Sequence, residues 1–168
     1  MTEEEGVIED GADPLAEYGI RDLTEGDLPW VAEWERVVFG PAAWSAALIE
    51  HDFAHGARRY RGIERAARLE GYAVYGFDGD AFTLMNLAVI PEARGEGLGR
   101  ALLDDFLREG ENLGLAEAWL EVAVTNEAAI SLYRSAAFED VRIRPRYYQP
   151  EGIDAMVMRI RLPRALPV

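Results

Sequence analysis

The chain has 168 residues, no cysteine and a formal net charge of −14 at pH 7, from 17 basic and 31 acidic residues. The lack of cysteine excludes disulfides, thiolate zinc sites and cysteine nucleophiles. The acidic balance disfavours direct binding of nucleic acid, and it favours either cationic polypeptide partners or no role beyond solubility. No apolar run approaches the roughly 20 residues of a membrane span, and the acidic start lacks the order of a signal peptide, so we expect a cytoplasmic protein with no membrane partner.

The length predicts one folded domain. Residues 1–17 are acidic and contain little to bury, and we expect them to form a flexible N-terminal extension. The folded domain should span residues 18–163.

Hydrophobic periodicity and turn residues predict the elements of that domain. In chain order they are a strand from Tyr18, a helix from an N-cap at Thr24 to Gly40, a helix from Trp44 to Phe53, strands at 60–66, 69–77 and 81–90, a helix at 97–113 ended by Gly114, a strand at 117–124, a helix at 127–136 capped by Asn126, and strands at 141–148 and 155–162. This β-α-α-β-β-β-α-β-α-β-β order predicts an α/β fold, in which helices flank one mixed, mostly antiparallel central sheet.

A glycine-rich loop joins the strand at 81–90 to the helix that follows it. Its sequence is Arg94-Gly95-Glu96-Gly97-Leu98-Gly99-Arg100. Glycines let backbone N–H groups approach a ligand closely, and a helix N-terminus adds partial positive charge. We therefore expect a site for a phosphate-bearing cofactor, against the alternative of a plain helix-capping turn. The chain has no lysine, which excludes a P-loop, and the glycine spacing does not match G-x-G-x-x-G.

The spacing Arg94-x-x-Gly97-x-Gly99 resembles the pyrophosphate loop of the GNAT superfamily, the acetyl-coenzyme A dependent N-acetyltransferases. A second stretch, in which Leu120-Glu121-Val122 precedes Asn126 and Tyr133, is also similar to GNAT enzymes. The C-terminal part resembles the RimI branch of that superfamily, because a double tyrosine precedes the run Asp154-Ala155-Met156-Val157-Met158. Together with Trp44-Ser45, the resemblance extends over residues 19–162.

The resemblance implies acetyl-coenzyme A as cosubstrate, with no metal. It places the oxyanion against a backbone N–H of the strand before the glycine loop, and the pantetheine amides along the same strand. The cofactor contacts that it implies are Leu87, Ala88, Val89, Arg94, Gly95, Glu96, Gly97, Leu98, Gly99, Arg100, Asn126 and Tyr133. The histidines His51 and His55 stand one helical turn apart but lack an H-E-x-x-H motif, and we expect a solvated helix end there.

The catalytic pair implied by the resemblance is Glu121 as general base and Tyr133 as general acid, in a direct transfer without an acyl-enzyme. Glu121 lies in an apolar strand, where burial would make its carboxylate a stronger base. The alternatives are a glutamate on the solvent face of the strand and a tyrosine that only packs in the core.

The resemblance to RimI enzymes implies a protein as the acceptor, namely the N-terminal alanine of a basic small-subunit ribosomal protein. We expect Trp44, Tyr147 and Tyr148 to border the acceptor slot, with at most one of the adjacent tyrosines pointing inward because strand residues alternate. Glu35 and Glu50 are weaker candidates for this slot, and each can equally lie in the core or on a solvated face. We expect a monomer or a weak homodimer.

Two positions depart from the RimI pattern: Ala123 replaces an arginine, which leaves the acceptor preference open, and Ala137 replaces a glycine, which costs little unless φ is positive. Two other functions also remain open. They are acetylation of lysine or a small-molecule amine on the same fold, and a non-catalytic coenzyme A sensor.

Overall fold

The computed structural model describes residues 17–163. Apart from Glu17, the N-terminal extension expected at residues 1–17 therefore lies outside the described residues. None of the helices in the described part is long and apolar enough to cross a membrane.

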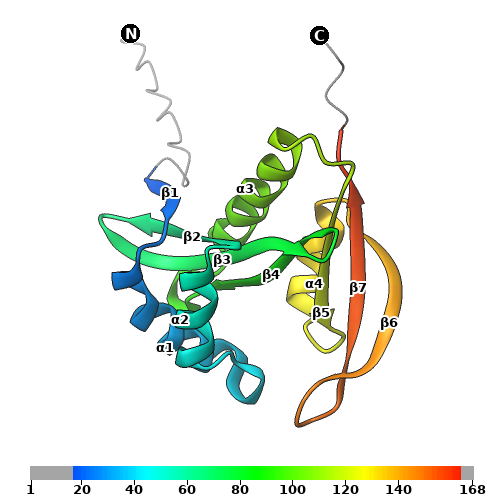
Figure 1. The fold of residues 1–168 in the computed structure, drawn as a ribbon, viewed down its shortest axis with the longest axis horizontal. Helices are drawn as coiled ribbons and strands as arrows, with labels where there is room; N and C mark the ends of the chain where they lie inside the picture. The colour runs from blue at the N-terminus through cyan, green and yellow to red at the C-terminus, as the bar shows by residue number, and fades with distance from the viewer. Residues whose placement is uncertain (1–16, 164–168) are drawn as a thin grey trace, which may run out of the picture.

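One seven-stranded sheet organises the fold, in the spatial order β1-β2-β3-β4-β5-β7-β6 (Figure 1). Every neighbouring pair is antiparallel except β4 and β5, which are parallel. The α/β fold with a mixed, mostly antiparallel sheet is confirmed. The strands are β1 (Tyr18–Asp22), β2 (Arg58–Arg65), β3 (Arg68–Asp78), β4 (Ala81–Val89), β5 (Glu117–Ala123), β6 (Glu139–Tyr148) and β7 (Ile153–Arg161). The helices are α1 (Leu28–Phe39), α2 (Ala46–His55), α3 (Leu98–Asn112) and α4 (Glu127–Ser135), with short 3-10 turns at Glu25–Asp27, Gly40–Ala42 and Pro91–Ala93.

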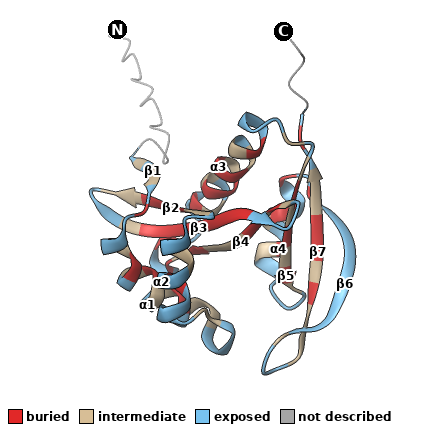
Figure 2. Cartoon of the chain, in the orientation of Figure 1, coloured by how far each residue is buried: buried red, intermediate tan, exposed pale blue. Residues whose placement is uncertain are grey.

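Two hydrophobic cores lie on the two faces of the sheet. Helices α1 and α2 contribute Val31 and Ile49 to one core, and α3 and α4 contribute Phe106 and Ile130 to the other. Strand β3 contributes side chains to both cores, because Tyr72 and Val74 point to the first core while Ala73 and Tyr75 point to the second. Figure 2 shows the result: β3 is buried along most of its length, whereas the edge strand β6 is exposed.

The start of α1 corrects one prediction. Thr24 is the N-cap not of α1 itself, which begins at Leu28, but of the 3-10 turn Glu25–Asp27 that leads directly into it. The Asp27 carboxylate accepts hydrogen bonds from the Thr24 N–H at 2.7 Å and from its hydroxyl at 3.1 Å. Pro29 follows in the first turn of α1, where its missing N–H costs no intrahelical bond.

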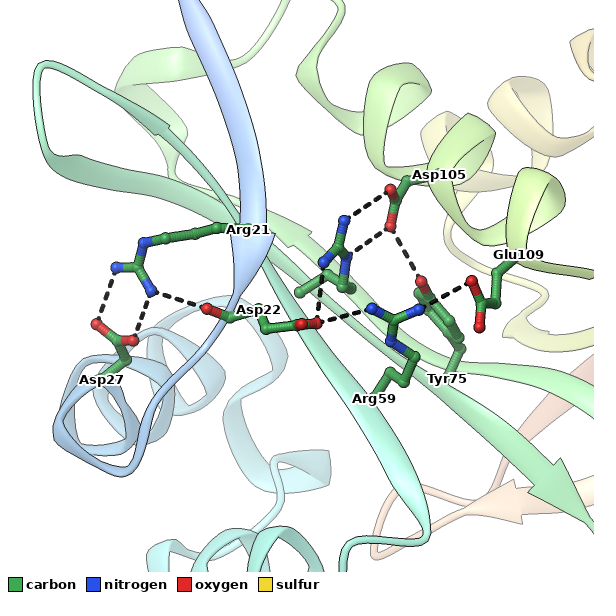
Figure 3. Close-up of polar contacts among 8 residues, drawn as sticks. Arg21, Asp22, Asp27, Arg59, Tyr75, Asp105 and Glu109 are labelled. Carbon is green, nitrogen blue, oxygen red and sulfur yellow. Dashed lines mark hydrogen bonds and ion pairs between the residues drawn. The ribbon is translucent and has the colours of Figure 1, made fainter. Parts of the chain in front are cut away.

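A polar network fixes α3 against the sheet (Figure 3). The carboxylate of Asp105 accepts two hydrogen bonds from Arg61, at 2.9 and 3.0 Å, and one from the Tyr75 hydroxyl at 3.0 Å. Asp22 of β1 joins the network through Arg59 at 3.0 Å and through Arg61 at 2.9 Å. Because Asp105 is 8% exposed, these charge-assisted bonds hold the helix in one orientation.

Candidate functional site

The parallel strands β4 and β5 part after a short contact. They are paired only at Thr83 with Trp119 and at Leu84 with Leu120. At that point the register of β4 against β3 shifts by one residue, so that Met85 is an extra, bulged residue. Beyond the bulge β4 follows β3 and β5 follows β7, which opens the sheet between them.

A cavity of about 1020 Å³ occupies this opening. Its volume lies at the upper end of the range of small-molecule sites, about 300–1,000 Å³. With the exception of Glu96 and the weaker candidate Glu50, every residue predicted for the site lines it: Glu35, Trp44, Leu87, Ala88, Val89, Arg94, Gly95, Gly97, Leu98, Gly99, Arg100, Glu121, Asn126, Tyr133, Tyr147 and Tyr148.

The edge of β4 turns backbone groups toward the cavity. The N–H of Ile90 donates to the carbonyl of Glu70 at 2.9 Å, so Ile90 bonds toward β3. Residues of an antiparallel strand alternate between the two neighbours, so Ala88 also bonds to β3 while the amides of Leu87 and Val89 face the opposite edge. That edge is the one β5 leaves, and the side chain of Arg94 already donates to the Val89 carbonyl there, at 3.3 Å.

The glycine loop presents a second set of backbone donors. Gly95 and Gly97 have φ angles of +80° and +84°, a conformation that non-glycine residues rarely adopt. The first intrahelical bond of α3 runs from Ala101 to Gly97 at 3.0 Å. The N–H groups of residues 98–100 therefore have no partner within the helix, and they lie at the positive end of its dipole. This geometry fits a phosphate group.

Glu96 points away from the cavity although it belongs to the loop. Its carboxylate accepts a hydrogen bond from the Tyr18 hydroxyl at 2.7 Å, and the ring of Tyr18 lies 4.9 Å from the guanidinium carbon of Arg65. The contact holds a negative charge on the outer side of an anion-binding loop. A direct cofactor contact by Glu96 stays a prediction.

Glu121 lies in the middle of β5, opposite Val157 of β7. Its carboxylate forms an ion pair with the guanidinium of Arg144 from β6, and its side chain is 23% exposed. The carboxylate is therefore mostly covered, as an apolar strand predicts, and it lies beside an arginine that the sequence did not predict. Sequence reasoning missed Arg144, which is separated from Glu121 by 23 positions and reaches it only through the pairing of β5, β7 and β6.

Tyr133 of α4 is 7% exposed and also lines the cavity. Its ring packs against Phe138, with 6.0 Å between the centroids. Burial raises the pKa of Tyr133 to about 12, so its hydroxyl keeps its proton at neutral pH. The residue thus belongs to the core and to the cavity wall at once. Asn126 likewise belongs both to the cavity wall and to the end of a helix, because its side chain caps α4 by accepting a hydrogen bond from the Ala129 N–H at 3.2 Å.

Both tyrosines of β6 line the cavity, contrary to the expectation that at most one would point inward. The cause is an irregularity in β6 between Arg144 and Tyr148, where Arg146 has a φ of +51° and regular alternation breaks down. The two rings are 5.0 Å apart in an edge-to-face arrangement. Burial raises the pKa of Tyr147 and of Tyr148, and the neighbouring Glu121 carboxylate adds to both shifts.

The wall of the cavity opposite these tyrosines comes from the segment between α1 and α2. Trp44 lines it, as predicted, together with Phe39, Pro41 and Ala42. Glu35 is buried at 1% exposure and lines the cavity, whereas Glu50 is exposed and is not among the lining residues. In Figure 1 this segment and the β6–β7 hairpin both extend toward the lower edge of the molecule.

The two histidines of α2, His51 and His55, have ring centroids 4.5 Å apart. Within residues 17–163, no group of three or more side chains of the metal-ligating types lies close enough together to hold an ion.

Comparison with known proteins now identifies the family of this fold. Residues 19–138 match the acetyltransferase (GNAT) family. The chain belongs to this family. The GNAT family uses acetyl-coenzyme A, a cosubstrate that carries phosphate groups.

Several relatives indicate the branch of the GNAT family to which the chain is most similar. An uncharacterised Mycobacterium leprae protein is 38% identical over 145 residues, which are 83% of this chain and 40% of that protein, so the chain spans less than half of its length. The N-alpha-acetyltransferase RimI of Mycobacterium tuberculosis is 35% identical over 82% of this chain and 88% of that protein. The crystal structure of the Escherichia coli ribosomal-protein-S18-alanine N-acetyltransferase matches with a TM-score of 0.76 and 33% identity, over 89% of this chain and 96% of that one. This GNAT acetyltransferase is therefore RimI-like, as its motifs predicted.

The structure shows where the two departures from the RimI pattern, Ala123 and Ala137, lie. Ala123 ends β5 and lines the cavity, at a position where an arginine would add a positive charge to the cavity wall. Ala137 has a φ of +74°, so the alanine occupies a conformation that favours glycine. Because φ is positive here, the replacement of glycine by alanine carries a conformational cost.

Proposed function

We propose that this chain transfers the acetyl group of acetyl-coenzyme A to the N-terminal α-amine of a protein, with the N-terminal alanine of a small-subunit ribosomal protein as the leading acceptor. The main support is a single feature, the cavity that runs between the parted strands from the glycine loop to Glu121 and Tyr133. The N-alpha-acetyltransferase activity of the M. tuberculosis relative supports the α-amine, and the E. coli relative, which acts on the alanine of ribosomal protein S18, supports the acceptor.

The residues of the loop and of β4 fit the proposed cosubstrate. The backbone N–H groups of residues 98–100 and the side chain of Arg94 would hold its pyrophosphate. The outward-facing amides of Leu87 and Val89 would bind its pantetheine arm as a further strand would. Bound there, acetyl-coenzyme A supplies an acetyl group activated as a thioester.

Three groups of the chain would then act on protons and charge. The carboxylate of Glu121, oriented by Arg144, accepts the proton of the acceptor amine directly or through water. An N–H of Leu87 or Val89 donates to the acetyl oxygen as that oxygen gains negative charge. The hydroxyl of Tyr133 gives its proton to the departing sulfur. An α-amine has a pKa of about 7.7–8.0, so a moderate base suffices.

The first test is a coenzyme A release assay with two peptides. One has a free N-terminal alanine followed by a basic sequence, and the other has a blocked N-terminus and one internal lysine. We expect turnover only with the free N-terminus, and loss of that turnover in Glu121→Gln. Glu117→Gln, a change in the same strand outside the main cavity, should retain it. Turnover of the blocked peptide would instead assign the chain to lysine acetylation, and binding of acetyl-coenzyme A without any turnover would favour a small-molecule acceptor or a sensor.

The acid role of Tyr133 is tested by Tyr133→Phe. The phenylalanine ring keeps the packing against Phe138 and removes only the proton donor, so we expect kcat to fall by about 10²–10⁴-fold with the KM for acetyl-coenzyme A unchanged. Steady-state kinetics on the alanine peptide measures both constants. Tyr75→Phe removes a hydroxyl that bonds to Asp105 away from the cavity, and it should leave kcat intact. An unchanged kcat in Tyr133→Phe would remove the residue from the chemistry.

A further inference from the structure

Glu35 is a buried carboxylate that the proposed chemistry does not use. It lies in α1, is 1% exposed and lines the cavity. Its two oxygens accept hydrogen bonds from three residues: from the Trp44 N–H at 3.0 Å, from Nδ2 of Asn86 at 3.0 and 2.9 Å, and from the Tyr72 hydroxyl. Burial raises the pKa of Glu35, and the same three donors act in the opposite direction because they stabilise its charge.

The donors come from three elements that meet at the cavity. Trp44 precedes α2 and forms part of the wall opposite Tyr147 and Tyr148. Asn86 follows the bulged Met85 in β4 and directly precedes Leu87. Tyr72 is a buried residue of β3. The carboxylate thus ties the wall formed by the α1–α2 segment to the strand whose amides face the opening.

We propose that Glu35 is a positioning residue of this acetyltransferase, which fixes the α1–α2 segment against β4 and thereby sets the geometry of the acceptor end of the cavity. The inference rests on the function proposed above, since it takes the space between Trp44 and the two tyrosines as the acceptor slot. The bonds require acceptor oxygens on Glu35, because all three partners donate to it.

The informative substitution is Glu35→Gln, which preserves size but replaces one acceptor oxygen with an N–H₂ group. In the orientation that keeps the Trp44 bond, the new N–H₂ group faces the Tyr72 hydroxyl, which can accept, and the N–H₂ group of Asn86, which cannot. At least one bond from Asn86 is therefore lost, and the tie between the α1–α2 segment and β4 is weakened. Adding Asn86→Asp reverses the pair, because the glutamine N–H₂ can then donate to the aspartate. Tyr72→Phe removes a single donor and serves as a milder variant that retains the other bonds.

Two measurements follow the effect. Hydrogen exchange reports whether the Trp44 amide and the segment around it lose protection, without need of an acceptor. Steady-state kinetics on the alanine peptide reports KM for acceptor and for acetyl-coenzyme A separately. For Glu35→Gln we expect faster exchange at Trp44 with α3 unchanged, an acceptor KM raised about tenfold, and an unchanged KM for acetyl-coenzyme A. The double variant should recover both properties in part, and Tyr72→Phe should show a smaller change in the same direction.

Glu33→Gln, an exposed position of the same helix, is the matched control and should behave as the wild type. Unchanged Trp44 exchange in Glu35→Gln, or a loss of protection that extends equally to α3, would overturn the inference, as would an acceptor KM that stays constant. If the wild type fails to acetylate the peptide, the proposed function fails by itself, and the exchange experiment still decides whether Glu35 holds the α1–α2 segment.

Discussion

At the scale of single residues, the end of α4 is held in an unfavourable conformation. Ala137 has a φ of +74°, and it terminates the helix through hydrogen bonds of 3.0 Å from its own N–H to Arg134 and from the Phe138 N–H to Tyr133. This is the Schellman arrangement, in which the left-handed residue is usually glycine. The strain therefore lies four positions after the tyrosine proposed as the acid.

Ala137→Gly should stabilise the protein. The left-handed conformation costs an L-residue roughly 1–2 kcal/mol, and the greater freedom of glycine in the unfolded chain offsets part of the gain. We expect the free energy of unfolding to rise by about 0.5–1 kcal/mol, measured by urea denaturation. The neighbouring Ala136 has a φ of −88°, so Ala136→Gly should instead lower stability. A gain at both positions would speak against relief of backbone strain.

Motif spacing identified many residues of the cavity wall, including Glu121, Tyr133 and the glycine loop. It could not identify Arg144 or the partners of Glu35, because both sets of contacts join segments that meet only after the sheet has formed. The two inward-facing tyrosines were also out of reach, since the break in alternation depends on a left-handed Arg146. The catalytic and binding roles of all these residues stay predictions.

At the scale of elements, the β2–β3 hairpin shows the same kind of strain as the end of α4. Arg65 pairs with Arg68, so the turn consists of Ala66 and Ala67, whose φ angles are +47° and +60°. Two positive φ angles define a type I′ turn, which favours Asn-Gly. The sequence predicted both strands but carried no residue typical of this turn.

The double change Ala66→Asn and Ala67→Gly should therefore raise the melting temperature, through a gain of about 1–2 kcal/mol in the free energy of unfolding. Differential scanning calorimetry measures it. The β3–β4 turn already has glycine at a positive φ, because Gly79 is at +61°, and Gly79→Ala should lower the melting temperature by a comparable amount. An unchanged melting temperature in the double variant would mean that the alanines are not strained.

The order of the elements along the chain and most of their boundaries followed from periodicity, because each helix has an apolar face and each hairpin a turn. The separation of β4 from β5 did not follow from periodicity. The opening begins at the bulge at Met85, which reverses the alternation of β4. Phe82 and Leu84 before the bulge and Leu87 and Val89 after it therefore face the same core, a switch that no local stretch of sequence specifies.

At the scale of the whole molecule, arginine–carboxylate pairs should shape the response to acid. Hydrogen bonds from Arg21 at 2.8 and 3.1 Å lower the pKa of Asp27 from 3.8 to about 2. Arg61 lowers the pKa of Asp22, and Arg134 that of Asp140. A carboxylate with a lowered pKa in the folded state stabilises it above about pH 4, and this contribution is lost as the pH falls toward 2.

Asp27→Asn should flatten that dependence. We expect the variant to lose about 0.5–1 kcal/mol of stability at pH 6 relative to the wild type, and the difference to shrink as the pH falls from 4 to 2. Urea denaturation at a series of pH values measures it. Glu25→Gln, an exposed change in the same turn, is the control and should run parallel to the wild type. A difference that stays constant down to pH 2 would rule out the linkage.

The boundary between β4 and β5, where the sheet opens, also divides the chain into two stretches. Residues 18–112 form β1 to β4 with the first three α-helices, and residues 117–161 form β5 to β7 with α4. The backbone crosses this boundary once, near Gly114, so the glycine loop belongs to one continuous stretch and Glu121 and Tyr133 to the other. Neither stretch lines the whole cavity, so under the proposed function a chain severed at Gly114 would acetylate its acceptor only after the two fragments associate.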